Sequence, residues 1–186
     1  MQALNKIRNR VTGRKLITVT VIFVVLIVVM NILAAILTQS TGVQLLDYAL
    51  DDTHSKGYET IGKLGSDGRN FYLILLSIDF LFPVVYMIFG VSLLGYLLNR
   101  FATKDSLLNL LILLPVLGML CDWVENVMIV SMINIFPNEL PWLADIGSVS
   151  TKLKFMFLGA TLLLAFVLWL VGFFKTRTGY LAKEQK

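Results

Sequence analysis

The residues most able to take part in binding or catalysis are acidic side chains placed inside long apolar segments of the chain. The first is Asp79, which shares a helical face with Pro83 and Tyr86 because the three residues are spaced i, i+4 and i+7. A carboxylate among apolar residues can accept a hydrogen bond from a ligand, pair with a cation or carry a proton. This pattern indicates a candidate site for binding or proton transfer.

A second polar face lies in the next apolar segment. Asp122, Glu125 and Asn126 are spaced i, i+3 and i+4, so one face of a helix carries all three. The following segment contributes Lys154, which can pair with either acid. The candidate ligand-binding residues are therefore Asp79, Tyr86, Asp122, Glu125, Asn126 and Lys154. If the protein is an enzyme, its catalytic candidates are the three acids.

Four apolar segments must position these residues. The chain has 186 residues, is 57% hydrophobic and has a mean hydropathy of +0.79, which is far from the composition of a soluble domain. A helix needs roughly 20 residues to cross a hydrocarbon core of about 30 Å. We expect an all-α integral membrane four-helix bundle that forms a single transmembrane domain. Its spans are predicted at about 16–37, 71–98, 107–136 and 149–174.

The distribution of basic residues predicts the orientation of the bundle. Lysines and arginines are concentrated before the first span, between the second and third spans and after the fourth span, whereas the other connections are mainly acidic. The positive-inside rule then places both termini in the cytoplasm of a multi-pass membrane protein. The basic residues concerned are Lys6, Arg8, Arg10, Arg14, Lys15, Arg100, Lys104, Lys175, Arg177, Lys183 and Lys186.

The connection over residues 38–70 is the longest and is predicted to cap the outer side of the bundle. Its pattern predicts two short amphipathic helices, Gly42–Leu50 and Gly57–Leu64, followed by a turn at Asp67-Gly68. The second outer connection, from Pro137 to Gly147, contains two prolines and a tryptophan and is predicted to be an ordered turn.

Depth and charge determine what the acids can do. Counting from the outer helix ends at about 1.5 Å per residue places Lys154 about 8 Å deep, Asp79 about 12 Å, Glu125 about 16 Å and Asp122 about 21 Å. An ionisable residue at the centre of a span costs at least about 2.5 to 3.5 kcal/mol, so these residues should converge inside the bundle. Lys154, even with the shallower Lys152, does not neutralise three acids, so the remainder must be protonated, bound to a cation or hydrated. The alternative is that a pair between Lys154 and an acid only holds helices in register.

Other polar features of the spans need no ligand. Pro83 and Pro115 each remove one backbone hydrogen bond and should kink their helices. The side chains of Tyr86, Asn126 and Ser131 are explained more simply by hydrogen bonds between helices than by ligand contacts.

Several classes of function are disfavoured. His54 is the only histidine and Cys121 the only cysteine, so neither a metal site nor a redox motif is expected, and no cofactor is predicted. The net charge of +4 is explained by the basic ends of the spans, so nucleic acid is not an expected partner.

The layout distantly resembles the EXPERA membrane proteins, the group of sterol isomerases and the sigma-2 receptor. The resemblance is carried by the four-span plan with both ends inside, by the capping loop, by Asp79-Phe-Leu-Phe-Pro83-Val-Val-Tyr86, and by the acids in Leu-Leu-Pro115 to Asn126. It implies a cavity for a sterol-like or cationic amphiphile, with Asp79 and either Asp122 or Glu125 as polar contacts or proton carriers. The chain departs from the isomerases because it has no intramembrane histidine.

Three hypotheses follow. The first is a protein whose polar cavity in the outer leaflet binds a lipid-like amphiphile or a cation. The second is a membrane-embedded enzyme, an isomerase or hydrolase, that uses the buried carboxylates on a lipid. The third is an accessory subunit of a membrane complex. The expected partners are the lipid bilayer, an amphiphilic small molecule, and a second copy of the chain or another membrane protein.

Overall fold

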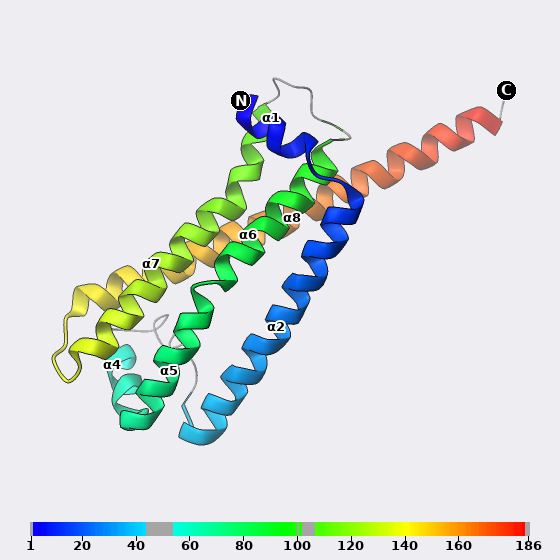
Figure 1. Ribbon diagram of the computed structural model, residues 1–186. Helices are drawn as coiled ribbons and strands as arrows, with labels where there is room; N and C mark the ends of the chain where they lie inside the picture. Colours follow the sequence, from blue (N-terminus) through cyan, green and yellow to red (C-terminus); the bar gives the residue numbers. More distant parts are fainter. Residues whose placement is uncertain (1, 44–53, 100, 102–106, 185–186) are drawn as a thin grey trace.

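A computed structural model describes residues 2–43, 54–99, 101 and 107–184 of the chain (Figure 1). The described residues form helices and connections without any strand, which confirms the all-α prediction. The elements in chain order are α1 (Gln2–Asn9), α2 (Gly13–Thr41), α4 (His54–Lys63), α5 (Gly65–Asp79), α6 (Phe82–Leu98), the 3₁₀ helix η1 (Leu107–Leu113), α7 (Leu114–Ile135) and α8 (Pro141–Glu184).

Four of these helical stretches are long and apolar enough to cross a membrane. They extend over Gly13–Thr41, Gly65–Leu98, Leu107–Ile135 and Pro141–Lys175. Each overlaps a predicted span, but three of them begin earlier than the hydropathy indicated. The largest difference is in the fourth stretch, where the helix begins at Pro141 and not near residue 149. The expected turn from Pro137 to Gly147 is therefore wrong over its second half, because proline is favoured in the first turn of a helix.

The second stretch is interrupted next to Pro83, as the sequence predicted. Helix α5 ends at Asp79 and α6 begins at Phe82. Around the break the amide of Val84 donates to the carbonyl of Leu81, which leaves the normal helical pattern at this point. In the third stretch, Pro115 lies in the first turn of α7, directly after the 3₁₀ helix η1. Both prolines therefore mark a change of helix geometry.

The long helices pack unequally. Helices α7 and α8 form the most extensive contact, α6 packs on both of them, and α2 packs mainly on α5 and α6. Figure 1 shows α2 at one side of the bundle and the C-terminal part of α8 projecting beyond the other helices. The side chains of α2 are half-buried or exposed along most of its length. Helix α2 is therefore the most loosely held of the four.

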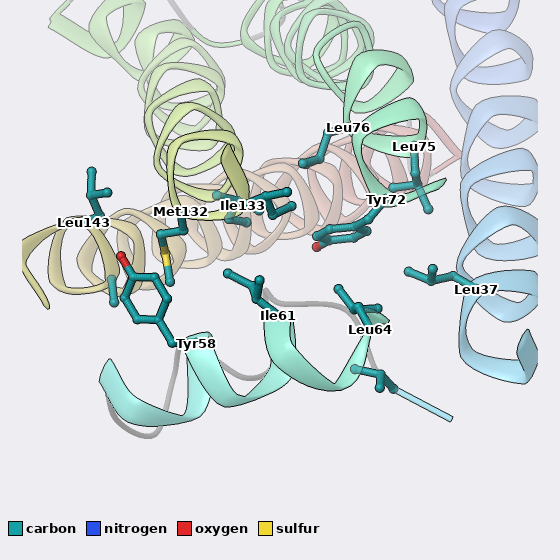
Figure 2. Close-up of a cluster of buried hydrophobic side chains, with 13 residues drawn as sticks. Leu37, Tyr58, Ile61, Leu64, Tyr72, Leu75, Leu76, Met132, Ile133 and Leu143 are labelled. Atoms are coloured by element: carbon teal, nitrogen blue, oxygen red, sulfur yellow. The ribbon is translucent and has the colours of Figure 1, made fainter. Parts of the chain in front are cut away.

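Helix α4 covers one end of the bundle, which we call the α4 end. Figure 2 shows Tyr58 and Ile61 of α4, and Leu64 directly after it, pointing into a cluster of buried apolar side chains. The hydroxyl of Tyr58 accepts a hydrogen bond from the amide of Leu140 at 2.9 Å and donates one to its carbonyl at 3.1 Å. The side chain thereby attaches α4 to the start of α8. The predicted helix Gly57–Leu64 is confirmed as far as Lys63, where α4 ends, whereas most of the predicted helix Gly42–Leu50 lies outside the described residues.

The predicted turn at Asp67-Gly68 is wrong because both residues lie inside α5. The reversal occurs instead at Gly65, whose φ of +67° favours glycine. Gly68 has a different role: a Cβ there would lie 2.9 Å from the Cγ2 of Thr41, so its missing side chain lets α5 approach α2.

Helix α1 folds over the opposite end of the bundle, the α1 end (Figure 1). The buried guanidinium of Arg8 donates to the Oδ1 of Asn109 at 2.8 Å, and the Nδ2 of Asn99 donates to the carbonyl of Arg8 at 3.1 Å. These contacts attach α1 to both α6 and η1.

Candidate functional site

The contact between α7 and α8 brings together two of the predicted acids and the predicted lysine. The Nζ of Lys154 lies 2.5 Å from the Oε2 of Glu125 and 3.4 Å from the Oδ1 of Asp122. All three residues are buried, and Glu125 has no exposed surface. Two carboxylates therefore share one ammonium group in the interior of the bundle.

Thr151 completes this arrangement and was not among the predicted site residues. Its Oγ1 lies 2.7 Å from the Oε1 of Glu125 and 3.0 Å from the carbonyl of Gly147, and both oxygens can accept its proton. The spacing could have revealed it, because Thr151 lies three residues before Lys154 on the same face of α8. We call Asp122, Glu125, Thr151 and Lys154 the charged cluster.

The four members of the charged cluster lie at similar depth because α8 begins early. Counted from Pro141 at about 1.5 Å per residue, Lys154 lies about 20 Å along α8. Asp122 lies about 20 Å from the end of α7 at Ile135, and Glu125 about 15 Å. Lys154 therefore lies farther from the start of its helix than expected, level with the acids it contacts.

Tyr86 and Asn126 lie beside the charged cluster and are also buried. The phenol of Tyr86 extends from α6 and is close enough to Asp122 to interact with its carboxylate. Its hydroxyl makes no well-aligned hydrogen bond with the described residues, and the same is true of the Nδ2 of Asn126. Both groups therefore keep hydrogen-bonding capacity for another partner.

Asp79 differs from the other two acids because it is only half-buried, at the end of α5. It is near enough to Tyr86 to affect it electrostatically. The helix break beside it is supported by Trp123 of α7, whose indole Nε1 donates to the carbonyl of Phe80 at 3.0 Å. In a regular helix the amide of Val84 would donate to the carbonyl of Phe80. Here it donates to Leu81, so the indole of Trp123 supplies the hydrogen bond to Phe80 instead.

Tyr86 also lines an apolar cavity, to which no member of the charged cluster contributes. Its volume is about 130 Å³, and its wall is almost wholly apolar. Four helices contribute to it, with Phe23 from α2, Phe82, Tyr86, Phe89 and Gly90 from α6, Pro115 from α7, and Leu158, Thr161 and Leu162 from α8. Tyr86 thus presents its ring to the apolar cavity and its hydroxyl to Asp122.

Aromatic rings close the apolar cavity between α2 and α6. The ring of Phe23 stacks on that of Phe89 with centroids 4.6 Å apart and lies 6.1 Å from that of Phe82, nearly parallel to both. On the α8 side, Leu162 is 57% exposed. The cavity therefore has a closed aromatic wall on one side and an exposed leucine at its rim on the other.

Other polar residues do not add to the site. Among the described residues no three histidine, cysteine, aspartate or glutamate side chains are grouped so that they could hold a metal ion. Lys152 is exposed, and the guanidinium of Arg69 lies 5.0 Å above the ring of Phe136 at the α4 end.

Comparisons with known proteins give no family assignment. No family model matches the chain, and neither curated proteins nor solved structures provide a match. Function is therefore inferred from the geometry of the charged cluster and the apolar cavity, and the resemblance to the EXPERA proteins stays a prediction.

Proposed function

We propose that this protein crosses a membrane four times, with both termini in the cytoplasm, and binds a lipid-like amphiphile inside its helical bundle. The polar group of the ligand lies between Tyr86 and Asp122, and its hydrocarbon part occupies the apolar cavity. The observation that carries the proposal is the position of Tyr86, whose ring lines an apolar cavity while its hydroxyl lies beside a buried carboxylate. An amphiphile has the same two parts in the same order.

The chemistry of the two groups indicates which polar head would fit. Asp122 offers carboxylate oxygens, and the hydroxyl of Tyr86 can donate or accept. A ligand amine can donate to both groups, and a ligand hydroxyl can donate to Asp122 while accepting from Tyr86. The cluster itself contains two carboxylates for one ammonium, which favours a positively charged head over a negatively charged one. We therefore expect amines to bind more tightly than alcohols of the same chain.

This proposal is tested by thermal unfolding of the protein in lipid nanodiscs with three ligands that share one chain. Oleylamine should stabilise the protein most, oleyl alcohol less, and methyl oleate least because it has no donor for Asp122. The variant Asp122→Asn should lose the stabilisation by oleylamine. Asp145→Asn, which changes an exposed aspartate at the start of α8, should retain it. Equal melting temperatures with and without all three ligands would refute the proposal.

A second candidate function is acid or base catalysis on the bound lipid. It is favoured by the two carboxylates that share Lys154, since such a group can hold and release a proton. It predicts that lipid extracts incubated with the protein change in mass or isomer composition, and that Glu125→Gln abolishes the change. Recovery of every lipid unchanged would exclude this function and leave binding as the proposal.

The cytoplasmic position of both termini has its own test. Because the α1 end carries Lys6, Arg10, Arg14, Lys15 and Lys175, fluorescent proteins that fold only in the cytoplasm should be bright when fused to either terminus. Fluorescence from only one of the two fusions would contradict the four-span topology.

A further inference from the structure

The volume of the apolar cavity limits the shape of its ligand. A cavity of about 150 Å³ holds a molecule the size of benzene, whereas pockets for drug-sized ligands are about 300 to 1,000 Å³. With about 130 Å³, the apolar cavity can hold a single ring or a short length of one hydrocarbon chain. A fused sterol ring system is larger than this space, so a flexible single chain should fit it better than a sterol does.

A longer chain must therefore leave the cavity, and the structure indicates where. Phe23 stacks on Phe89 and closes the side between α2 and α6. The lining residue with the greatest exposure is Leu162 of α8, and the main packing partners of α2 are α5 and α6. The side between α2 and α8 is thus the one through which a chain can pass.

The depth of this opening indicates what surrounds it. At about 1.5 Å per residue, Tyr86 lies about 18 Å from the α1 end of α6, and Phe23 about 15 Å from the α1 end of α2. These positions are near the middle of a hydrocarbon core of about 30 Å, where the surrounding solvent is acyl chain. A chain that leaves the cavity beside Leu162 can continue directly into the bilayer.

We infer that the ligand is a single-chain amphiphile that enters sideways from the bilayer between α2 and α8. Its polar head reaches Tyr86 and Asp122, the first few carbons fill the apolar cavity, and the rest of the chain passes Leu162 into the lipid. This inference rests on the proposed function and adds the shape of the ligand and its route. Leu162 is its gatekeeping residue, although it touches neither the polar head nor the charged cluster.

Two neighbouring leucines provide a matched test. Leu162→Trp adds bulk at the rim of the cavity, while Leu163→Trp adds the same bulk to a residue that is 65% exposed and does not line it. Thermal unfolding in nanodiscs is measured with oleylamine and with a sterol that carries an amine in place of its hydroxyl. Oleylamine should stabilise the wild type and Leu163→Trp. Leu162→Trp should bind it about tenfold more weakly, and the sterol amine should have no effect.

The outcomes separate this inference from the proposed function. Stabilisation by the sterol amine, or equal binding of oleylamine by both tryptophan variants, would overturn the single-chain route while amphiphile binding would stand. Failure of every amphiphile to stabilise the wild type would overturn both.

If Leu162→Trp does not fold, the wild type can be irradiated with an oleylamine that carries a diazirine near its amine. Labelling of the α8 segment around Leu158 and Thr161 is expected. Labelling confined to exposed side chains such as Leu163 would contradict the route.

Discussion

The charged cluster and the apolar cavity are neighbours with opposite properties. In the charged cluster, Lys154, Glu125 and Asp122 contact one another directly and Thr151 adds a hydrogen bond, so the groups are closed against each other. In the apolar cavity, side chains from four helices leave a space that none of them fills. The buried charges and the unfilled space of the bundle thus lie in two separate regions. We expect the cluster to govern stability and the cavity to govern ligand shape, with Tyr86 linking them.

Of the substitutions considered, Lys154→Met should lower the stability most. Removal of the ammonium leaves two buried carboxylates without their shared partner, and breaking a buried ion pair from one side costs about 3 to 5 kcal/mol. The free energy of unfolding measured in detergent should fall by that amount. Lys152→Met, two residues away on the exposed side of α8, serves as the control and should change it far less.

If the unpaired charges cause the instability of Lys154→Met, two further substitutions should restore its stability. Combining Lys154→Met with Asp122→Asn and Glu125→Gln removes all three charges and should recover most of the lost stability. A triple variant as unstable as Lys154→Met alone would show that the lysine side chain acts through packing, and the assigned role of the cluster would be wrong.

A smaller loss is expected from Thr151→Val. The substitution keeps the shape of the side chain and removes its hydrogen bond to Glu125, and a hydrogen bond to a charged group contributes about 1.5 to 3 kcal/mol. Unfolding experiments should show a decrease within that range, while the ratio of the affinities for oleylamine and oleyl alcohol stays the same. A changed ratio would mean that the hydrogen bond from Thr151 to Glu125 also shapes the head-group site at Asp122.

Trp123→Phe should have the smallest effect of the three. It removes only the hydrogen bond to the carbonyl of Phe80, and such bonds between membrane helices average about 0.6 kcal/mol. Because this bond supports the break that precedes Tyr86, we expect a small loss of stability together with weaker binding of oleylamine. Unchanged binding would show that Trp123 does not help to position Tyr86.

The sequence predicted the helices well because their length and composition are local properties. The periodicity also placed Asp122 and Glu125 on one face, and the expectation that they would meet Lys154 inside the bundle is confirmed. The predicted depth of Lys154 is wrong because the sequence pattern places Pro141 and Trp142 in a turn, whereas they begin α8. Proline in a first helical turn was the signal that could have corrected this error.

The apolar cavity could not be predicted from the sequence. Its lining residues come from four helices, and their apolar side chains are the same types that fill a packed core. Whether such residues fill the space between helices or leave it open depends on helix positions to within a side chain, which hydropathy does not determine. Asp79 is the opposite case, since its residue type suggested a buried site and the structure leaves it half-exposed at a helix break.

The most direct test of amphiphile binding is to locate the hydrocarbon chain of a bound ligand in the apolar cavity. We suggest crystals grown from a lipid mesophase in the presence of a long-chain alkylamine with a bromine atom close to its amine. If the amphiphile binds as proposed, an anomalous bromine peak lies inside the apolar cavity, between Phe89 and Thr161, with the amine between Tyr86 and Asp122. A cavity without bromine in a protein saturated with the ligand, or a peak only on the outer faces of the helices, would contradict it.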